Sequence, residues 1–514
     1  MIALTLAEIA EITGGVLHDG ADPEAIVSSF VEFDSRKITA GGLFLALPGA
    51  RVDGHDYANT AMAAGAVAVL AARPVGVPAI VVTPNGRGDS TSEVYAHDED
   101  GSAKAVVDAL SALAHAVVTK LVHDSGLTVV GITGSAGKTS TKDFVASVLR
   151  QAGDTVAPPG SFNNEVGLPY TALRCDSDTR FLVAEMSARG IGHIAHLAEI
   201  TPPRIGAVLN VGSAHLGEFG SRDNIARAKG ELVEALPAGN EGGVAVLNLD
   251  DPFVAAMSSR TRARVLTYSA TTPPSSGADL WASNVVLDDV ARASFTLNSR
   301  SDSAQVTLQV FGEHQVSNSL AAAAIGLEAG LSLQQVAEGL QNHKSASAHR
   351  MDVRTGVDGV TVINDSYNAN PDSMRAGIAA LAYTVSARPH ARAIAVLGEM
   401  NELGPDAAGS HRALGEELDR YRVGYLVAVG DSPNTRAMAE EARARGINTE
   451  IAADVDEAVS LVESVLRTCP AEYNANGNPG DVVLVKASNS LGLWRVAEGL
   501  LTSRYHHEEK TKGI

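Results

Sequence analysis

The sequence predicts an α/β protein of three domains with a phosphate-binding, parallel-sheet domain in the middle. Its 514 residues correspond to about three domains at roughly 150 residues each. Strands and helices alternate twice, once from residue 128 and again after residue 347. A glycine-rich turn also lies between a β-branched strand and an amphipathic helix. We place the domains at 1–102, 103–346 and 347–514.

Composition excludes several classes of protein. Hydrophobic residues at 45% and charged residues at 19% are typical of a globular chain and exclude wholesale disorder. The net charge of −20 argues against a broad nucleic-acid-binding surface. Cys175 and Cys469 cannot form a disulfide framework, so we expect a reducing, cytoplasmic location. The most apolar stretch, 61–82, is interrupted by an arginine and two prolines, so we expect no membrane-spanning segment.

The first unit begins with a short predicted helix. Apolar residues recur at helical spacing after Thr5, and Thr5 with Glu8 has the pattern of a capping box. Apolar strands are expected at 43–47 and 79–82. Residues 85–101 are polar and rich in glycine, serine and acidic residues, which indicates a loop or linker.

The middle unit is predicted as a sheet covered on both faces, because its strands are unbroken apolar runs. The expected strands are 128–133, 181–186, 205–211 and 244–249, and the expected helices are 103–122, 138–151, 224–236 and 316–329. From 264 to 310 the pattern changes to a period of two, which favours an antiparallel addition to the sheet. In the last unit, strands are expected at 360–364, 393–397, 425–429 and 482–486, with helices between them, as in a small doubly wound domain.

The glycine-rich turn carries the strongest chemical signal. It consists of Gly134, Ser135, Ala136, Gly137, Lys138, Thr139 and Ser140. Backbone N–H groups in such a turn bind phosphate oxygens, with the positive end of the following helix behind them. Lys138 would neutralise the β- and γ-phosphates, and the Thr139 hydroxyl would ligate Mg²⁺. The bland alternative is a glycine turn that precedes a lysine by chance, but its position between a strand and a helix favours phosphate binding.

The register of this turn and several later strings resemble the Mur ligase superfamily, whose members are ATP-dependent, amide-forming enzymes with three domains. The strings are 134–140, 161–169, Glu185, 210–216, 314–318, 349–351 and 364–371. The resemblance implies an N-terminal domain that binds a UDP-substrate, a central P-loop-type domain that binds ATP, and a Rossmann-like C-terminal domain.

One group of strings narrows the resemblance within the family. Residues 364–371, together with 33–36 and 53–56, are most similar to members that add D-alanyl-D-alanine to UDP-N-acetylmuramoyl-tripeptide in peptidoglycan synthesis. The resemblance implies ATP and two Mg²⁺ ions as cofactors, and we expect a monomer without nucleic-acid or membrane partners. The third residue of the acceptor peptide, diaminopimelate or lysine, stays open.

The resemblance also implies roles for single residues in catalysis and metal binding. The catalytic residues would be Lys138, Glu185, His215 and Lys229, and the metal ligands Thr139, Glu185, His215 and, if carbamylated, Lys229. The bland alternatives are a solvated glutamate at a strand end, a structural loop histidine and a solvated helix lysine.

Further residues are implied in binding the nucleotide and the two other substrates. Nucleotide contacts would come from Asn318 at the adenine and from Arg350, Asp365 and Tyr367. Substrate contacts would come from Ser35, Arg36, His55 and Asp56 for the uridine diphosphate, from Asn163 and Asn164 near the acceptor peptide, and from Asn368 and Asn370 for the incoming dipeptide. The alternatives without a binding role are that the asparagines only form turns or begin helices, that Arg350 and Asp365 form an ion pair between domains, and that Tyr367 is a packed core residue.

The implied reaction activates a carboxylate as an acyl phosphate, which the dipeptide amine then attacks. Two other members of the superfamily remain alternatives: the ligase that adds the third residue, and a folylpolyglutamate-type synthase. In a different class, a P-loop NTPase switch would bind nucleotide without ligase activity, and a non-enzymatic scaffold would have no turnover at all.

Overall fold

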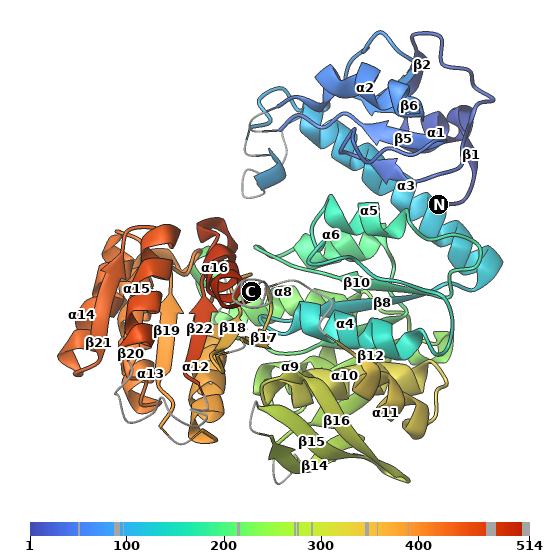
Figure 1. Cartoon of the computed structure of the whole chain (residues 1–514). Helices are drawn as coiled ribbons and strands as arrows, with labels where there is room; N and C mark the ends of the chain where they lie inside the picture. The colour runs from blue at the N-terminus through green and yellow to red at the C-terminus, as the bar shows by residue number, and fades with distance from the viewer. Residues whose placement is uncertain are drawn as a thin grey trace, which may run out of the picture.

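The computed structural model describes residues 1–49, 52–86, 93–95, 97–212, 216–271, 274, 277–288, 291–344, 349–356, 358–388, 390–468 and 480–505. Within them, strands form three large sheets, one in each successive part of the chain, and one two-stranded ribbon. Figure 1 shows the N-terminal unit (blue) above the central unit and the C-terminal unit (orange and red) beside it. The predicted α/β class is therefore confirmed.

The N-terminal unit is built on a five-stranded sheet in the order β2-β7-β6-β5-β4. Its strands are β2 (Val16–His18), β4 (Val31–Glu32), β5 (Gly42–Leu45), β6 (Ala66–Ala71) and β7 (Ala79–Val81), and β1 (Leu4–Thr5) pairs with β3 (Ile26–Val27). The predicted capping box is present, because Thr5 caps α1 (Leu6–Thr13) and Glu8 bonds back to it. Helix α2 (Ala58–Ala63) packs against β6.

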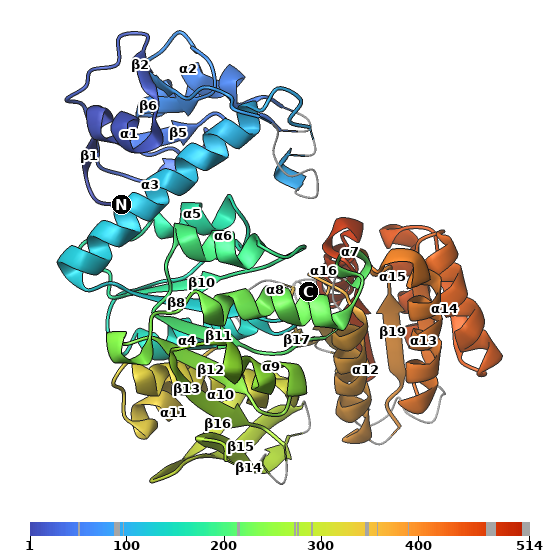
Figure 2. The same ribbon diagram turned by 180° about the vertical axis from the view of Figure 1, so that it is seen from behind.

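One long helix, α3 (Ser102–Ser125), connects the N-terminal and central units, and Figure 2 shows it running diagonally between them. It packs against α1 on one side and α5 on the other. By length and composition alone this helix would be long and apolar enough to cross a membrane, which is weak evidence for a membrane span. In addition, 61% of its most apolar window is buried inside the protein, as in a core helix.

The central unit has a nine-stranded sheet in the order β16-β15-β14-β13-β12-β11-β8-β10-β9. Its strands are β8 (Thr128–Thr133), β9 (Thr155–Val156), β10 (Phe181–Glu185), β11 (Ile205–Val208), β12 (Val244–Asn248), β13 (Arg264–Ser269), β14 (Leu280–Leu287), β15 (Arg292–Ser299) and β16 (Ser303–Phe311). Strands β8 to β13 pair in parallel, and β14 joins β13 in parallel as well. The antiparallel addition, predicted from residue 264, is therefore confined to β14, β15 and β16.

The order of strands reverses at β8. The chain runs from β8 to β9 and β10 on one side and then crosses to β11 on the other. Loops that leave parallel strands at such a point diverge and open a crevice at the carboxyl ends of the strands. The glycine turn, Glu185 and Asn210 all lie at this edge, because they follow or end β8, β10 and β11.

Helices cover both faces of the central sheet. They are α4 (Lys138–Leu149), α5 (Gly167–Ala172), α6 (His193–Ile200), α7 (Leu216–Phe219), α8 (Arg222–Glu234), α9 (Pro252–Ala256), α10 (His314–Glu328) and α11 (Leu333–Asn342). Helices α3, α5, α6 and α8 share one hydrophobic cluster with the sheet, and α4, α10 and α11 share the cluster on the opposite face. This two-sided burial explains the unbroken apolar strands.

The C-terminal unit has a six-stranded sheet in the order β17-β18-β22-β19-β20-β21. Its elements are β17 (Asp352–Thr355), β18 (Thr361–Asn364), α12 (Pro371–Ser386), β19 (Ala393–Leu397), α13 (Ala407–Arg420), β20 (Tyr425–Val429), α14 (Pro433–Ala444), β21 (Asn448–Ala452), α15 (Val455–Arg467), β22 (Val482–Lys486) and α16 (Trp494–Tyr505). The sequence missed β17 and β21. Both are edge strands that are covered less completely, so neither has a continuous apolar run.

Polar contacts join the three units. Glu32 in the N-terminal unit accepts hydrogen bonds from Arg174, at 2.7 Å, and from Tyr170 in the central unit. On the other side, Arg189 of the central unit pairs with Glu402 of the C-terminal unit at 3.3 Å.

Candidate active site

A cavity of about 820 Å³ lies between the central and C-terminal units at the carboxyl edge of both sheets. Fifteen of the residues singled out from the sequence line it: Ser135, Ala136, Gly137, Lys138, Thr139, Ser140, Asn163, Asn164, Glu185, Asn318, Arg350, Asp365, Tyr367, Asn368 and Asn370. Because they come from two units and are spread over more than 200 residues of sequence, the fold itself assembles this group.

The glycine turn adopts the conformation that phosphate binding requires. Gly137, the cap of α4, has a φ of 82°, in the left-handed region that favours glycine. A Cβ atom at Gly137 would lie 2.5 Å from the Asn318 Oδ1 atom, so a larger residue would also collide with α10. Glycine at this position therefore allows both the turn and the close approach of Asn318.

Asn210, which had no predicted role, fixes the same turn from the loop after the neighbouring strand β11. Its side-chain oxygen accepts a hydrogen bond from Ala136 N–H at 2.9 Å, and its amide donates to the Ala136 carbonyl at 3.1 Å. Its backbone carbonyl accepts from Ser135 N–H at 3.1 Å. The partners lie 74 residues apart in sequence, so no local pattern could have predicted this contact.

Lys138 is half-buried next to the turn. Its ammonium group donates to the Gly134 carbonyl at 2.9 Å. Burial lowers the pKa of Lys138, and the negative charge of Glu185 opposes that effect. An anionic phosphate in the cavity would also favour the charged form of this lysine.

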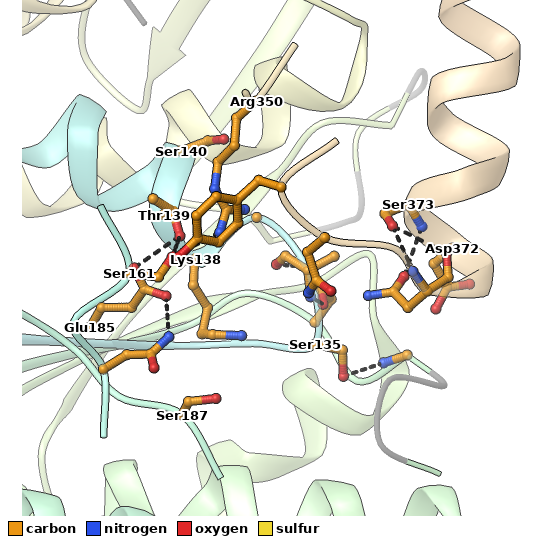
Figure 3. Close-up of a pocket in the computed structure, with 18 of the residues that line it drawn as sticks. Ser135, Lys138, Thr139, Ser140, Ser161, Glu185, Ser187, Arg350, Asp372 and Ser373 are labelled. Atoms are coloured by element: carbon orange, nitrogen blue, oxygen red, sulfur yellow. Dashed lines mark hydrogen bonds between the residues drawn. The ribbon is translucent and has the colours of Figure 1, made fainter. Parts of the chain in front are cut away.

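Oxygen atoms gather next to Lys138. The Thr139 hydroxyl donates to Glu185 Oε2 at 3.0 Å and lies 2.8 Å from the Ser161 hydroxyl. Figure 3 shows Thr139, Ser161 and Glu185 next to one another. Asn163 donates to the other oxygen of Glu185 at 2.8 Å. Hydroxyl and carboxylate oxygens are the ligands that Mg²⁺ prefers, and Mg²⁺ commonly takes only one or two protein carboxylates because substrate phosphates and waters complete its shell. The donor set therefore fits Mg²⁺ bound together with a nucleotide.

Arg350 enters the cavity from the C-terminal unit. It donates to the Ser161 hydroxyl at 2.8 Å, and its guanidinium lies 4.1 Å from the centre of the Tyr367 ring. Figure 3 shows Arg350 reaching down toward Thr139 and Ser161 from the side opposite Ser187. A fixed cation thus lies close to the phosphate turn across the boundary between the two units.

Two cavity-lining residues, Asn318 and His314, lie on the first turns of α10, and Asn318 is buried whereas the His314 side chain is exposed. Asn318 donates from its amide to Gln315 at 2.9 Å. Desolvation lowers the pKa of His314, and the negative charge of Asp365 partly opposes the shift. Both side chains line the cavity, whereas the sequence had singled out Asn318 alone.

A second cavity, of about 1000 Å³, adjoins the first. The two share Ser161, Asn164, Tyr367 and Asn489 in their walls. The second is lined by residues of all three units, among them Phe33, Phe162 and Trp494. The second cavity therefore borders the N-terminal unit on one side and the cavity of the glycine turn on the other.

Comparison with known proteins agrees with this architecture. Residues 28–117 match the Mur ligase family catalytic domain, 132–326 the Mur ligase middle domain, and 349–489 the Mur ligase glutamate ligase domain. A UDP-N-acetylmuramoyl-tripeptide–D-alanyl-D-alanine ligase from Mycobacterium tuberculosis is 52% identical over 98% of each chain. The chain belongs to the Mur ligase family.

Other Mur ligases support the same relationship. The Escherichia coli ligase of the same name is 33% identical over 84% of this chain and 86% of its own. Among solved structures, MurF from Acinetobacter baumannii has a TM-score of 0.79 at 27% identity, covering 98% of this chain and 99% of its own. MurF from Thermotoga maritima, solved in complex with ADP, has a TM-score of 0.72 at 26% identity and covers 94% and 99%.

Two asparagines of the loop before α12 hold that loop in shape. Asn370 is the N-terminal cap of α12 and accepts a hydrogen bond from Ser373 N–H at 2.8 Å. This is the purely structural role, an asparagine at the start of a helix, that the sequence analysis set beside substrate binding. Asn368 accepts from Ala369 N–H at 2.8 Å. Both nevertheless line the cavity. In this Mur ligase the loop thus has a local structural function and also faces the site.

Lys229 was expected to hold a metal ion together with His215. Lys229 lies on α8, is only 3% exposed and is not among the residues that line either cavity. Burial lowers its pKa well below the ordinary value, and the nearby charge of Lys138 lowers it further, so both effects favour the uncharged amine. His215 lies outside the described residues.

The structure does not bring the four residues expected to bind uridine diphosphate into either cavity. Arg36 is exposed and pairs with Asp34 at 2.9 Å. His55 donates from Nδ1 to Asp53 at 2.6 Å and accepts from Ala72 N–H at 3.1 Å, so both of its ring nitrogens are engaged. Ser35 is buried and Asp56 is exposed. These four stay a prediction.

Proposed function

We propose that this Mur ligase joins D-alanyl-D-alanine to UDP-N-acetylmuramoyl-tripeptide, with conversion of ATP to ADP and phosphate, to give the pentapeptide precursor of peptidoglycan. The observation that carries the proposal is the cavity between the central and C-terminal units. It holds the phosphate turn and Glu185 on one wall and the loop of Asn368 and Asn370 on the other. The relatives of this name match nearly the whole chain at 52% identity.

The chemistry follows from the charges that must meet in the cavity. A carboxylate oxygen of the acceptor peptide attacks the γ-phosphorus of ATP, which forms an acyl phosphate and releases ADP. The amine of the dipeptide then attacks the acyl carbon, the peptide bond forms, and phosphate leaves with the bonding electrons. The two reactants of the first step, the acceptor carboxylate and ATP, are both anions. Lys138, Arg350 and the backbone amides of the turn would lower the repulsion between them and would stabilise the charge on the transferred phosphoryl group.

Thr139 and Glu185 would hold Mg²⁺, because their oxygens lie 3.0 Å apart next to the turn. When bound, Mg²⁺ supplies further neutralisation of the phosphates. We propose a second Mg²⁺ ion as well, with His215 and carbamylated Lys229 as its protein ligands. The lowered pKa of Lys229 supports the carbamylation, because only an uncharged amine takes up carbon dioxide.

The nucleotide would lie along the wall formed by Asn318 and Arg350. Asn318 lies next to Gly137, and an amide can both donate to and accept from a purine edge. Asp365 would accept hydrogen bonds from the ribose hydroxyls. Tyr367, beneath the Arg350 guanidinium, would lie beside the adenine.

The acceptor substrate would extend through the second cavity toward the N-terminal unit. Its peptide carboxylate would lie near Asn163 and Asn164, next to the phosphate turn. Its uridine diphosphate would bind the N-terminal unit, where Ser35, Arg36, His55 and Asp56 remain our candidates. Asn368 and Asn370 would shape the opposite wall for the incoming dipeptide.

The proposal includes the organisation of the molecule. The domain boundaries 1–102, 103–346 and 347–514 are supported by the three separate sheets. We further propose that the protein acts as a cytoplasmic monomer. Light scattering with and without substrates would test the oligomeric state, and a constant mass of one chain is the expected result.

The direct test is mass analysis of the product formed from UDP-N-acetylmuramoyl-tripeptide, ATP–Mg²⁺ and D-alanyl-D-alanine. A pentapeptide mass is expected, and Lys138→Ala should abolish it while the exposed Lys120→Ala retains it. Replacing the dipeptide with D-alanine, a diamino acid or glutamate should stop product formation. Product with glutamate would instead favour a folylpolyglutamate-type synthase, and phosphate release without any amine would favour an NTPase switch.

A further inference from the structure

A buried lysine at the end of β22 connects the two halves of the C-terminal wall of the cavity. Lys486 is the last residue of this strand, which lies in the middle of the sheet between β18 and β19. Its side chain is only 2% exposed and lines the cavity. The four residues before it in the strand are all apolar, so no sequence pattern singled it out.

The ammonium group of Lys486 makes three contacts. It donates to Asp365 Oδ2 at 2.5 Å and to the Asn368 carbonyl at 2.9 Å, and it lies 3.4 Å from the Asp365 carbonyl. The other carboxylate oxygen of Asp365 accepts from Met351 N–H at 3.2 Å, next to Arg350 in the chain. One cation therefore holds the Asp365 carboxylate and the backbone at Asn368 at the same time.

The surrounding helix makes room for this side chain. Gly377 lies within α12, where glycine is unfavourable by roughly 1 kcal/mol relative to alanine. A Cβ atom there would lie 3.1 Å from Lys486 Cδ and 3.5 Å from a methyl group of Leu484. The aliphatic part of the Lys486 side chain therefore occupies space that a larger residue at position 377 would partly take up.

We propose that Lys486 is a positioning residue that couples the nucleotide side of the cavity to the dipeptide side, by fixing Asp365 and the loop of Asn368 against each other. This inference rests on the proposed function, which assigns Asp365 to the ribose and Asn368 to the dipeptide. Without Lys486, the carboxylate of Asp365 would be uncompensated in a cavity that takes up anionic ATP. The loop that begins α12 would lose its internal anchor at the same time.

The test is Lys486→Met, which keeps the length of the side chain and removes its charge. Arg392→Met is the matched control. It breaks the ion pair with Asp481, 2.6 Å long, at the opposite end of the same strand and away from both cavities. The affinities for ADP–Mg²⁺ and for D-alanyl-D-alanine are measured by titration calorimetry, and KM and kcat by steady-state kinetics.

We expect Lys486→Met to weaken both ligands and to raise both KM values, each on the order of tenfold, because displacements of about 1 Å in a site can have effects of this size or larger. Arg392→Met should leave both affinities unchanged. Weakening confined to the nucleotide, or affinities like those of the control, would overturn the inference. Lys486→Arg, which keeps the charge, should restore part of both affinities.

Gly377→Ala provides a second route if Lys486→Met does not fold. It displaces the lysine stem without removing the charge, and it should weaken both ligands in the same direction. Unchanged affinities in this variant would count against the coupling. Because binding is measured without turnover, a wild-type protein that makes no pentapeptide would refute the proposed function, while the ADP titrations would still test Lys486.

Discussion

Glu185 shows how single residues of the site depend on one another. Its two carboxylate oxygens are divided between Thr139, at 3.0 Å, and Asn163, at 2.8 Å, and the residue is only 1% exposed. A buried carboxylate is stable only when it is hydrogen-bonded or paired with a cation. Thr139, Asn163 and the nearby Lys138 provide these partners, and they leave the carboxylate facing the cavity.

Replacing Glu185 with glutamine should therefore impair metal use before it impairs folding. The amide oxygen of glutamine can still accept one hydrogen bond, but the negative charge that attracts Mg²⁺ is lost. We expect the Mg²⁺ concentration for half-maximal ADP formation to rise at least about tenfold, since the loss of one charged metal contact commonly has effects of this order. Glu234→Gln, on the outside of α8, is the control. An unchanged Mg²⁺ requirement in Glu185→Gln would remove Glu185 from the metal site.

His343 makes a prediction about pH. It caps α11, packs against the Phe144 ring with centroids 4.5 Å apart, and has a pKa lowered by burial to about 4 from an ordinary 6.5. Between these values the unfolded chain binds a proton that the folded chain excludes. The free energy of unfolding should therefore fall as the pH drops from about 6.5 toward 4, and the contribution of this residue should be about 3 kcal/mol.

His343→Phe keeps a ring of similar shape and removes the titration. In urea unfolding between pH 7 and pH 4, this variant should lose less stability than the wild type. Equal losses in the two proteins would show that the ring of His343 is accessible to protons in the folded state.

At the scale of elements, the phosphate turn is held by the loop after β11. Asn210 engages Ala136 through both ends of its amide, and Gly212 N–H donates to the Ser135 hydroxyl at 2.9 Å. Strand β11 ends at Val208, three residues earlier than the sequence suggested. The reason is that Asn210 directs its hydrogen bonds to the turn instead of to a neighbouring strand.

Asn210→Ala should loosen the turn and leave a buried N–H group unpaired. Such a loss costs about 1–3 kcal/mol of stability, and the rise in melting temperature on adding ADP–Mg²⁺ should shrink. The control is Asn298→Ala, which removes an amide bonded to Ser283 at 2.9 Å in the antiparallel part of the sheet. If the two variants respond equally to ADP–Mg²⁺, the turn does not depend on Asn210.

An element could be predicted when the residues that determine it lie next to one another in the sequence. Strand β8 and the strands β19, β20 and β22 have the predicted bounds, because each is an unbroken apolar run buried on both faces. The start of α1 was also predicted, since Thr5 and Glu8 carry the signal locally. The edge strands β17 and β21 were not predicted, because neither contains a continuous apolar run.

The same distinction applies to the site. The glycine turn and Glu185 are recognisable from short strings, and the structure brings them to one cavity. Lys486 and Asn210 depend on partners that are 121 and 74 residues away, so only the fold reveals them. For Ser35, Arg36, His55 and Asp56 the short strings gave a role that the geometry of the two cavities leaves untested.

At the scale of the whole molecule, the central and C-terminal units approach each other through two glycines. A Cβ atom on Gly404 would lie 2.5 Å from the Cα atom of Gly217, and the φ of Gly404 is 73°. The ion pair between Arg189 and Glu402 lies next to this contact in the chain. Close packing of backbone on backbone here brings the two walls of the cavity together.

Gly404→Ala should hold the two units apart. Gly446→Ala is a matched control, because Gly446 has a similar φ of 83° but nothing within 4 Å of the added Cβ atom. The free energy of unfolding should fall by similar amounts in the two variants, because both place alanine at a positive φ. Only Gly404→Ala should reduce kcat/KM, on the order of tenfold or more, since the site is completed by closure of the two units. Small-angle scattering should show a larger radius of gyration for Gly404→Ala alone. Equal kinetics for the two variants would contradict this role.

The central claim is that ATP activates the acceptor carboxylate at the phosphate turn. The most direct test uses UDP-N-acetylmuramoyl-tripeptide labelled with ¹⁸O in its reacting carboxylate, together with ATP–Mg²⁺ and D-alanyl-D-alanine. If the carboxylate attacks the γ-phosphorus, one labelled oxygen must leave with the phosphate, and mass spectrometry will find it there. Phosphate that carries no label, released alongside the pentapeptide, would contradict the account.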